Sequence, residues 1–131
     1  MTNKLPIFIV DEDPFWSHLL NEMLYKLGFL NVTNFFTGRE CINHLRLTPR
    51  VIFLDYHLDD ANGIQILQEI KKHDPLMCVV FCTASEDLCI AIDAMKFGSA
   101  DYLLKEDATI DQLNDILHGL KWKMAFTDKV F

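Results

Sequence analysis

The sequence predicts an α/β protein in which helices cover both faces of a parallel sheet. Four short runs, at residues 7–10, 51–54, 78–82 and 102–104, are apolar at every position, and polar residues follow each of them. A run of this kind is typical of a strand buried on both faces, as in parallel sheets covered by helices. Segments with helical spacing of apolar residues lie between these runs. Such alternation predicts parallel strands joined by right-handed crossovers.

The first expected strand covers residues 5–10, and a helix over residues 14–27 follows it. Asp13 is a good N-cap for this helix, and Pro14 stands at the first helical position, where a missing N–H costs nothing. Gly28 is the expected C-terminal stop. The apolar residues at helical spacing are Phe15, Leu19, Leu20, Met23, Leu24 and Leu27.

Residues 31–36 form a second, less apolar strand, which is expected nearer an edge of the sheet. Thr37 can cap a short second helix, and Pro49 follows its end. The apolar residues of that helix are Cys41, Ile42 and Leu45. The third strand covers residues 51–55, and a polar loop at 56–62 follows it.

The third helix begins after Gly63, and Pro75 ends it because a residue before proline avoids helical geometry. We expect Ile64, Leu67 and Ile70 on its buried face. A fourth strand follows at residues 77–82. The fourth helix opens at Thr83 or Ser85 and closes at Phe97-Gly98, with Leu88, Ile92 and Met95 pointing inward.

The fifth strand covers residues 101–104, and the fifth helix runs from about residue 109 into the 120s. Its apolar residues are Ile110, Leu113, Ile116, Leu117 and Leu120. We expect a single domain over residues 1–125, followed by a C-terminal tail at 126–131.

Composition excludes several classes of function. The formal net charge of −7 argues against binding of nucleic acid by this domain, because that binding depends on basic surface. No apolar run is long enough to cross a bilayer, and no signal peptide is evident, so a cytoplasmic location is expected. Cys41, Cys78, Cys82 and Cys89 show no metal-binding spacing, and Cys78 and Cys82 are expected to be buried as small apolar residues.

Polar side chains follow the apolar runs where each strand should leave the sheet. Asp11 and Glu12 follow the first strand, Asp55 ends the third, Thr83 follows the fourth and Lys105 the fifth. The carboxyl ends of parallel strands meet at one edge, where open α/β sheets bind ligands. Carboxylates in one pocket repel each other, and a hard divalent cation relieves that repulsion. The set therefore predicts a site for Mg²⁺ and a phosphoryl group.

The acidic residues of this set have different expected roles. Asp13 is explained by capping alone, whereas a cap cannot explain Asp11 and Glu12 as well. Asp55 is expected to attack a phosphoryl group and form an acyl phosphate, with Mg²⁺ neutralising the oxygens. Lys105 would pair with one phosphate oxygen, and the Thr83 hydroxyl would donate to another.

These residues resemble the motifs of a known family, the CheY-like receiver domains of two-component response regulators. The matching residues are Asp11-Glu12, Asp55, Gly63, Thr83-Ala84, Tyr102 and Lys105. The resemblance covers about residues 5–120. It implies a flavodoxin-like, doubly wound sheet of five parallel strands in the order 2-1-3-4-5, with five helices.

The resemblance also implies the chemistry of the site. Asp55 would accept a phosphoryl group from a sensor histidine kinase or a phosphotransfer protein. Asp11, Glu12, Asp55 and the backbone carbonyl of His57 would hold Mg²⁺. The protein would be no enzyme beyond its own phosphorylation and dephosphorylation. Ala84 is small enough to leave the phosphate accessible.

A conformational switch follows from the same resemblance. Phosphorylation would draw Thr83 inward, and Tyr102 on the fifth strand would follow it. The face built from the fourth helix, fifth strand and fifth helix would then change, and a partner would recognise the change. That partner is a downstream effector protein or an output domain missing from this chain, and homodimerisation through this face is possible.

The chain departs from the usual family pattern at three positions. Glu12 replaces the usual second Asp, and Asp59 stands where a Pro usually follows the phosphoacceptor by four residues. Glu106 replaces the Pro that often follows the Lys. These departures bear on the position of the ion, the Lys105 turn and the rates of phosphorylation and hydrolysis. His57 and Ser85 flank the site and are expected to influence attack by water.

Two alternatives remain open from the sequence. One is an inert receiver-like interaction module that keeps the fold and the signalling face without accepting phosphate. The other is a phosphohydrolase resembling the haloacid dehalogenases, with Asp11 of the segment Asp11-Glu12-Asp13 as nucleophile. The residue that becomes phosphorylated distinguishes the receiver, at Asp55, from the hydrolase, at Asp11.

Overall fold

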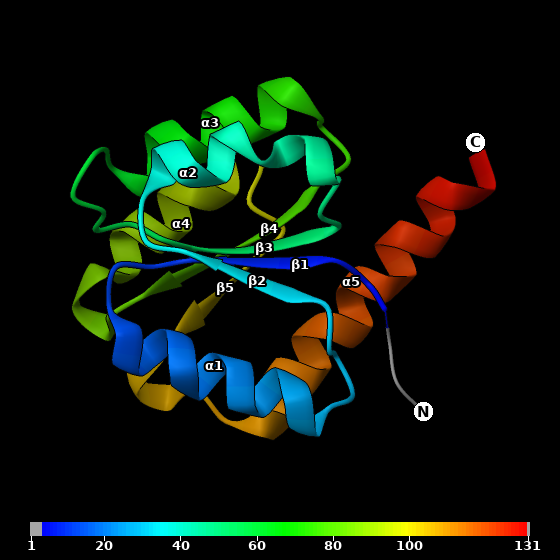
Figure 1. Cartoon of the computed structure of the whole chain (residues 1–131), viewed down its shortest axis with the longest axis horizontal. Coiled ribbons are helices and arrows are strands. Elements are labelled where there is room, and N and C mark those ends of the chain that lie inside the picture. The colour runs from blue at the N-terminus through cyan, green and yellow to red at the C-terminus, as the bar shows by residue number, and fades with distance from the viewer. Residues whose placement is uncertain (1–3, 131) are drawn as a thin grey trace.

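A five-stranded parallel sheet lies between two layers of helices in the computed structural model (Figure 1). The structure describes residues 4–130, except for the side chains of Ser85 and of residues 121–130. The strands are β1 (Ile7–Val10), β2 (Val32–Phe35), β3 (Val51–Asp55), β4 (Cys78–Thr83) and β5 (Asp101–Leu104). The α-helices are α1 (Pro14–Lys26), α2 (Gly38–Asn43), α3 (Gly63–His73), α4 (Leu88–Lys96) and α5 (Ile110–Val130). Short 3₁₀ turns cover Leu45–Leu47, Ser85–Asp87 and Lys105–Asp107.

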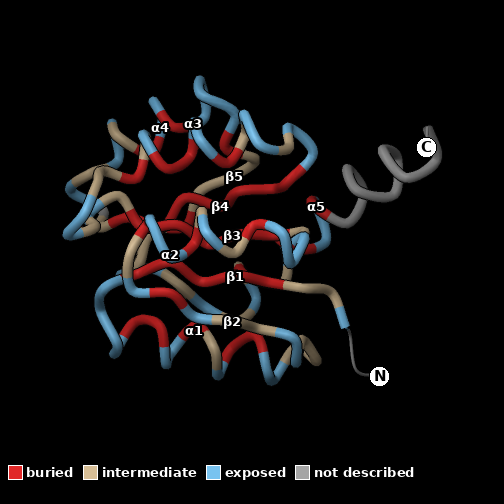
Figure 2. The backbone as a smooth tube through the Cα atoms, turned by 45° about the horizontal axis from the view of Figure 1, so that its top comes forward, coloured by how far each residue is buried: buried red, intermediate tan, exposed pale blue. Residues whose placement is uncertain are grey.

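The strand order β2-β1-β3-β4-β5 confirms the predicted topology. β1, β3 and β4 are buried at every residue, as expected of central strands covered on both faces. β2 lies at an edge and is only partly buried, which agrees with its lower apolar content (Figure 2). Because β1 and β3 are neighbours at the centre, the polar residues that follow them come together.

Alternate residues of the strands build two separate cores. Ile7 and Ile9 pack in the core that contains the buried residues of α1 and α5, and Phe8 and Val10 pack in the core that contains those of α2, α3 and α4. This alternation is the period-2 geometry of a strand. Figure 1 shows α1 and the first part of α5 below the sheet and the other three helices above it.

Helix α1 confirms the predicted caps, but its buried residues differ in part from the apolar residues that define its spacing in the sequence. The Asp13 side chain accepts a hydrogen bond from the Phe15 N–H, and Gly28 follows the helix with φ 92°. Phe15 and Leu19, two of the apolar residues at helical spacing, are 77% and 40% exposed. Trp16 is buried instead, together with Leu20, Met23 and Leu24. The sequence is compatible with two apolar stripes at helical spacing, one that contains Phe15 and Leu19 and one that contains Trp16 and Leu20.

Helix α4 corrects the prediction more completely. Leu88, Ile92 and Met95 were expected to point inward, but they are 37%, 48% and 41% exposed. The buried residues are Ala91 and Ala94. Small side chains let the α4 backbone approach the sheet closely, and the larger apolar residues are left on the outer face.

The remaining helices follow the sequence more closely. In α3, Leu67 and Ile70 are buried as predicted, Ile64 is half-buried, and Ile66 joins the core. The predicted residues of α5 pack as expected: Leu113, Ile116, Leu117 and Leu120 are buried, and Ile110 is partly buried. The expected tail, 126–131, is continuous with α5 as far as Val130, and Phe131 lies outside the described residues.

All four cysteines are free, and Cys89 alone among them is exposed. Among residues 4–130, no helix combines the length and apolar character needed to span a bilayer.

Gly63 fixes the end of the loop between β3 and α3. Its N–H donates to the Tyr56 carbonyl at 2.8 Å, which closes the loop, and Asn62 caps α3 through a reciprocal pair of hydrogen bonds with Gln65. A Cβ atom at residue 63 would lie 2.5 Å from the Asp55 carbonyl oxygen and 2.7 Å from Tyr56 Cα. Both of these neighbours are backbone atoms that a rotamer change cannot move. The close packing therefore requires glycine.

We expect Gly63→Ala to destabilise the protein by about 3 kcal/mol, the upper part of the usual range for overpacking. Gly119→Ala is the matched control, because a Cβ there meets nothing within 4 Å and Ala is favoured over Gly in a helix by about 0.5–1 kcal/mol. Chemical denaturation of the two variants measures the difference. Equal stabilities of the two variants would contradict the role given to Gly63.

Candidate functional site

The carboxyl edge of the sheet brings the predicted polar residues together. Asp11 follows β1 directly, and Asp55 is the last residue of β3. Thr83 is the last residue of β4, and Lys105 follows β5. Thr83 is paired in register with Leu104, so it lies next to the point where Lys105 leaves the sheet. Asp11 and Asp55 are 1% and 5% exposed, and Thr83 is fully buried.

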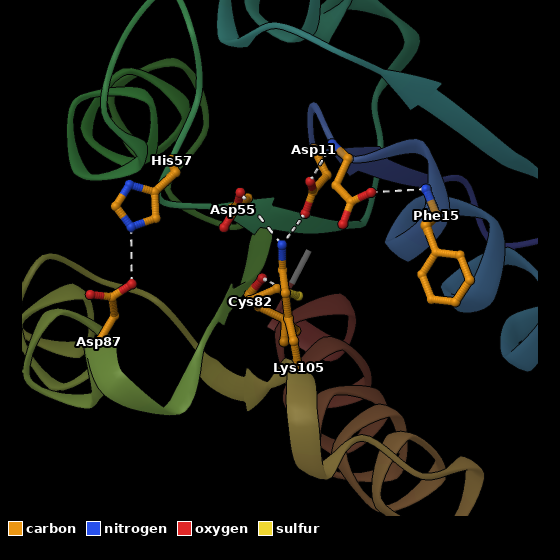
Figure 3. A network of polar contacts seen from close by, with 9 residues as sticks. Asp11, Phe15, Asp55, His57, Cys82, Asp87 and Lys105 are labelled. Carbon is orange, nitrogen blue, oxygen red and sulfur yellow. Dashed lines mark hydrogen bonds and ion pairs between the residues drawn. The ribbon is translucent and has the colours of Figure 1, made fainter.

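An ion-pair network joins three of these residues (Figure 3). The Lys105 Nζ atom lies 2.8 Å from Asp11 Oδ2 and 3.5 Å from Asp55 Oδ2. The other Asp11 oxygen, Oδ1, accepts a hydrogen bond from the Asp13 N–H at 2.9 Å. One ammonium therefore lies against two buried carboxylates, and the site is left with an excess of negative charge.

The pKa values of Asp11, Asp55 and Lys105 are shifted by burial and by the charges of their neighbours. Burial and the neighbouring charge of Asp11 raise the pKa of Asp55 to about 6, although Lys105 opposes the rise. Burial also raises the pKa of Asp11 despite its hydrogen bond to Lys105. Burial lowers the pKa of Lys105, but the hydrogen bond and charge of Asp11 outweigh it, so the net shift is upward and the ammonium stays charged. The site thus holds a fixed positive charge beside carboxylates that resist ionisation.

Asp55 should make stability depend on pH in the metal-free protein. Its pKa is about 6 in the folded protein, against an ordinary value of 3.8, so the folded state binds the proton more tightly. The resulting stabilisation is fully present below about pH 4 and is lost as the pH rises through about 6, a change on the order of 2–3 kcal/mol. Addition of Mg²⁺ at neutral pH should restore stability, because it would bind only the folded site.

Denaturation of wild type and Asp55→Asn in chelator at pH 5 and pH 7.5 measures this contribution. Asp11 and Glu12 shift in the same direction and are present in both proteins, so the difference reports Asp55 together with the effect of its charge on these neighbours. An identical pH slope in the two proteins would contradict the raised pKa.

Glu12 lies on the exposed side of the acidic pocket. A hydrogen bond to the Asp59 side chain, with smaller contributions from burial and from the charges of Asp59, Asp55 and Asp11, raises the pKa of Glu12. Glu12 and Asp59, which both stand where receivers usually have another residue, therefore contact each other. Sequence reasoning noted both positions but could not place them in contact.

The donor set fits a Mg²⁺ ion that retains water molecules. Its members are carboxylate oxygens. Burial is the main cause that raises the pKa values of Asp11 and Asp55, and the neighbouring Asp59 is the main cause for Glu12, so a bound cation would favour the ionised form of all three. Among the side chains that the structure describes, no group of three acidic, His or Cys residues is arranged so that it could hold a metal ion by itself. Mg²⁺ suits this arrangement, because it is commonly held by one or two carboxylates, water and a phosphate oxygen.

Thr83 offers a hydrogen bond that the described residues do not use. Its Oγ1 atom is buried, and among the residues whose side chains the structure describes it has no hydrogen-bond partner. A buried hydroxyl without a partner costs about 1–3 kcal/mol. An incoming phosphoryl oxygen at this edge would supply the missing acceptor. Ala84 is half-buried beside it, and Tyr102, also half-buried, is paired in register with Phe81 of β4.

Two loops beside the site are held by side-chain contacts that the sequence did not reveal. His57 Nε2 lies 2.9 Å from Asp87 Oδ2, which connects the loop after β3 to the start of α4 (Figure 3). Asp60 accepts hydrogen bonds from the N–H groups of Gly38 and Arg39 at the start of α2. These bonds outweigh the effect of burial and lower the pKa of Asp60. Both contacts join residues more than 20 positions apart, so no local pattern predicts them.

Trp16 is a further residue that sequence reasoning missed. It is 4% exposed, and Lys105 Nζ lies over its ring at 5.6 Å from the centroid. Because a buried Trp in an apolar helix face is most simply a core residue, the sequence carries no signal for this contact.

Comparisons with known proteins agree with this geometry. The family model described as response regulator receiver domain matches residues 7–118. The chain is 29% identical over 100 residues to the chemotaxis protein CheY of Thermotoga maritima, covering 76% of this chain and 83% of that protein. It is 34% identical over 99 residues to the DNA-binding transcriptional regulator NtrC of Klebsiella pneumoniae, covering 75% of this chain but 21% of NtrC.

Solved structures show the same fold. A response regulator receiver domain protein from Clostridium thermocellum has a TM-score of 0.82 and 27% identity, over 92% of this chain and 98% of that chain. The receiver domain of NtrX from Brucella abortus has a TM-score of 0.81 and 25% identity, over 88% of this chain and 98% of that chain.

Proposed function

The chain belongs to the family of response regulator receiver domains, and on that premise we propose that it is a phosphoacceptor in a two-component system, with Asp55 as the acceptor. One observation carries the proposal: the buried Asp55 carboxylate lies at the carboxyl edge of the sheet with Asp11 and the Lys105 ammonium beside it. A nucleophile, a cation for the phosphoryl oxygens and an acidic cation site are thus within reach of one another.

The transfer uses Asp55 as a nucleophile. A carboxylate oxygen of Asp55 attacks the phosphorus of a phosphohistidine on the donor protein, and the bond between phosphorus and the imidazole nitrogen breaks. The imidazole leaves with the electron pair and takes up a proton from solvent, while Asp55 becomes an acyl phosphate. Lys105 moves from the carboxylates to a phosphoryl oxygen, and Thr83 donates its unused hydroxyl hydrogen to another.

Asp11, Glu12, Asp55 and the backbone carbonyl of His57 would hold Mg²⁺. When bound there, the ion would neutralise negative charge on the phosphoryl oxygens. The contact between Glu12 and Asp59 places a further carboxyl group at the outer side of this site. Asp55, with a pKa of about 6, is largely ionised at neutral pH, as a nucleophile must be, and a bound cation would favour the ionised form further.

Phosphorylation then changes the side of the site that is formed by β4 and β5. The acyl phosphate satisfies the buried Thr83 hydroxyl and draws it inward, and Tyr102 follows within β5. Ala84 leaves room for the phosphate. The face of α4, β5 and α5 changes as a result, and a downstream effector, an output domain or a second copy of the chain recognises it.

The proposed phosphodonor is a protein of the same signalling system. The receiver family is a signalling domain rather than a conventional enzyme. A sensor histidine kinase or a phosphotransfer protein is the phosphodonor, and the domain acts in the cytoplasm. The self-phosphorylation and autodephosphorylation expected from the sequence belong to the same proposal. Asp13 serves as the N-cap of α1 and has no direct role in the transfer.

Incubation with acetyl phosphate, with and without Mg²⁺, tests the proposal. We expect the intact mass to increase by one phosphoryl group only when Mg²⁺ is present. An inert receiver-like module would show neither labelling nor Mg²⁺ binding. A haloacid-dehalogenase-like hydrolase has no support in the family assignment, and it would require labelling of Asp11 instead.

A further inference from the structure

We propose that Trp16 is a positioning residue for Lys105, which its ring holds between Asp11 and Asp55 in readiness for the phosphoryl group. The inference rests on the proposed function, because the position of Lys105 matters only if a phosphoryl oxygen arrives at Asp55. It assigns a role in the transfer to a residue that the structure buries in the core.

The position of Lys105 in the sheet explains why it needs support. Lys105 follows β5, whereas Asp11 follows β1, and β4 and β3 lie between those strands. The side chain must therefore reach across the sheet edge (Figure 3). A lysine side chain has many rotamers, and holding it in one extended conformation costs conformational entropy. The ion pair with Asp11 orders the tip of the chain, but that pair must loosen when Lys105 turns toward a phosphoryl oxygen.

The Trp16 ring supplies a contact that can persist through that change. Lys105 Nζ lies over the ring at 5.6 Å from the centroid, within the range of about 6 Å for an attractive cation–π interaction. Trp is the strongest aromatic partner, and the attraction grows when the pair is shielded from water. Here Trp16 is 4% exposed and the Lys105 side chain 20% exposed. The aromatic face attracts the ammonium without using any of its hydrogen bonds, so all of them remain available to carboxylate or phosphate.

The backbone beside Lys105 gives this support further importance. Glu106 stands where many receivers have a proline, and a 3₁₀ turn over Lys105–Asp107 follows β5 directly. The turn orders the backbone of Lys105, whereas the Trp16 ring contacts the charged end of its side chain.

Rates of labelling by acetyl phosphate in Mg²⁺ test the role with a matched set of variants. Trp16→Phe keeps a ring, and Trp16→Leu removes it; Trp16→Met is the substitute if the Leu variant does not fold. Met23→Ala is the control, because Met23 lies in the same buried cluster of α1, two turns away. We expect about a fivefold lower rate for Trp16→Leu, equivalent to about 1 kcal/mol. For Trp16→Phe and Met23→Ala we expect rates within about twofold of wild type.

A second measurement needs no phosphodonor. In wild type and Met23→Ala, the ε-methylene protons of Lys105 should show the upfield NMR shift expected above an aromatic ring, and this shift should vanish in Trp16→Leu. The proposal is overturned if Lys105 shows no such shift, if Trp16→Phe slows labelling as much as Trp16→Leu, or if Met23→Ala slows it equally. Absence of labelling in wild type would instead overturn the proposed function, and the role of Trp16 in transfer with it, while the NMR shift would still report the contact.

Discussion

Asp55→Asn is expected to lose all Mg²⁺-dependent labelling by acetyl phosphate, because the amide cannot form the acyl phosphate. The variant should still fold, since Asn fills nearly the same volume at the end of β3. In chelator at neutral pH it should be more stable than wild type, because it removes the cost of ionising a buried carboxylate whose pKa is about 6. Loss of labelling together with a gain in stability separates a functional carboxylate from a structural one.

Asp13→Asn is the control for this variant. Asp13 lies beside the site but caps α1, and Asn is as good a cap as Asp. Labelling of Asp13→Asn at the wild-type rate is expected, and intact-mass analysis measures both variants. Labelling that persists in Asp55→Asn but disappears in Asp11→Asn would return the nucleophile to Asp11.

Lys105→Met should slow labelling by about 100-fold, the usual effect of removing one preorganised donor from a charged transition state. The same substitution should not weaken Mg²⁺ binding. It removes the ammonium that lies 2.8 Å from Asp11 Oδ2, which competes with the ion for that carboxylate. In chelator the variant should be less stable at neutral pH, because two buried carboxylates lose their cation.

Lys96→Met is the matched control, because Lys96 forms an exposed pair with Asp93 on α4 and such pairs contribute little. Titration of Mg²⁺ by calorimetry and the rate of mass labelling separate binding from transfer. Parallel loss of Mg²⁺ affinity and labelling in Lys105→Met would show that Lys105 serves the cation site rather than the phosphoryl group.

The sequence was sufficient where a local pattern determines the structure. A fully apolar run that ends on a carboxylate identified both the central strand β3 and Asp55 at its end. The cap formed by Asp13 and Pro14, and the stop at Gly28, were likewise local and were confirmed. Such features depend on residues within one turn of each other, so a single sequence contains the whole signal.

The sequence was insufficient where packing chooses between equivalent patterns. On α4, two stripes fit the helical period, and only the close approach to the sheet selects Ala91 and Ala94 over the larger Ile92 and Met95. The contact between His57 and Asp87 joins two loops from different strands, and it exists only because β3 and β4 are neighbours. Site residues at strand ends could therefore be predicted, whereas the residues that position them could not.

The most direct test of the account is to identify the residue that carries the phosphoryl group. Wild-type protein labelled with acetyl phosphate in Mg²⁺ would be treated with sodium borohydride, which reduces an aspartyl phosphate to homoserine. Peptide mass spectrometry then locates the homoserine. Homoserine is expected at position 55 alone. A parallel sample prepared without Mg²⁺ is expected to contain none. Homoserine at position 11, or labelled protein with no homoserine at position 55, would contradict the account.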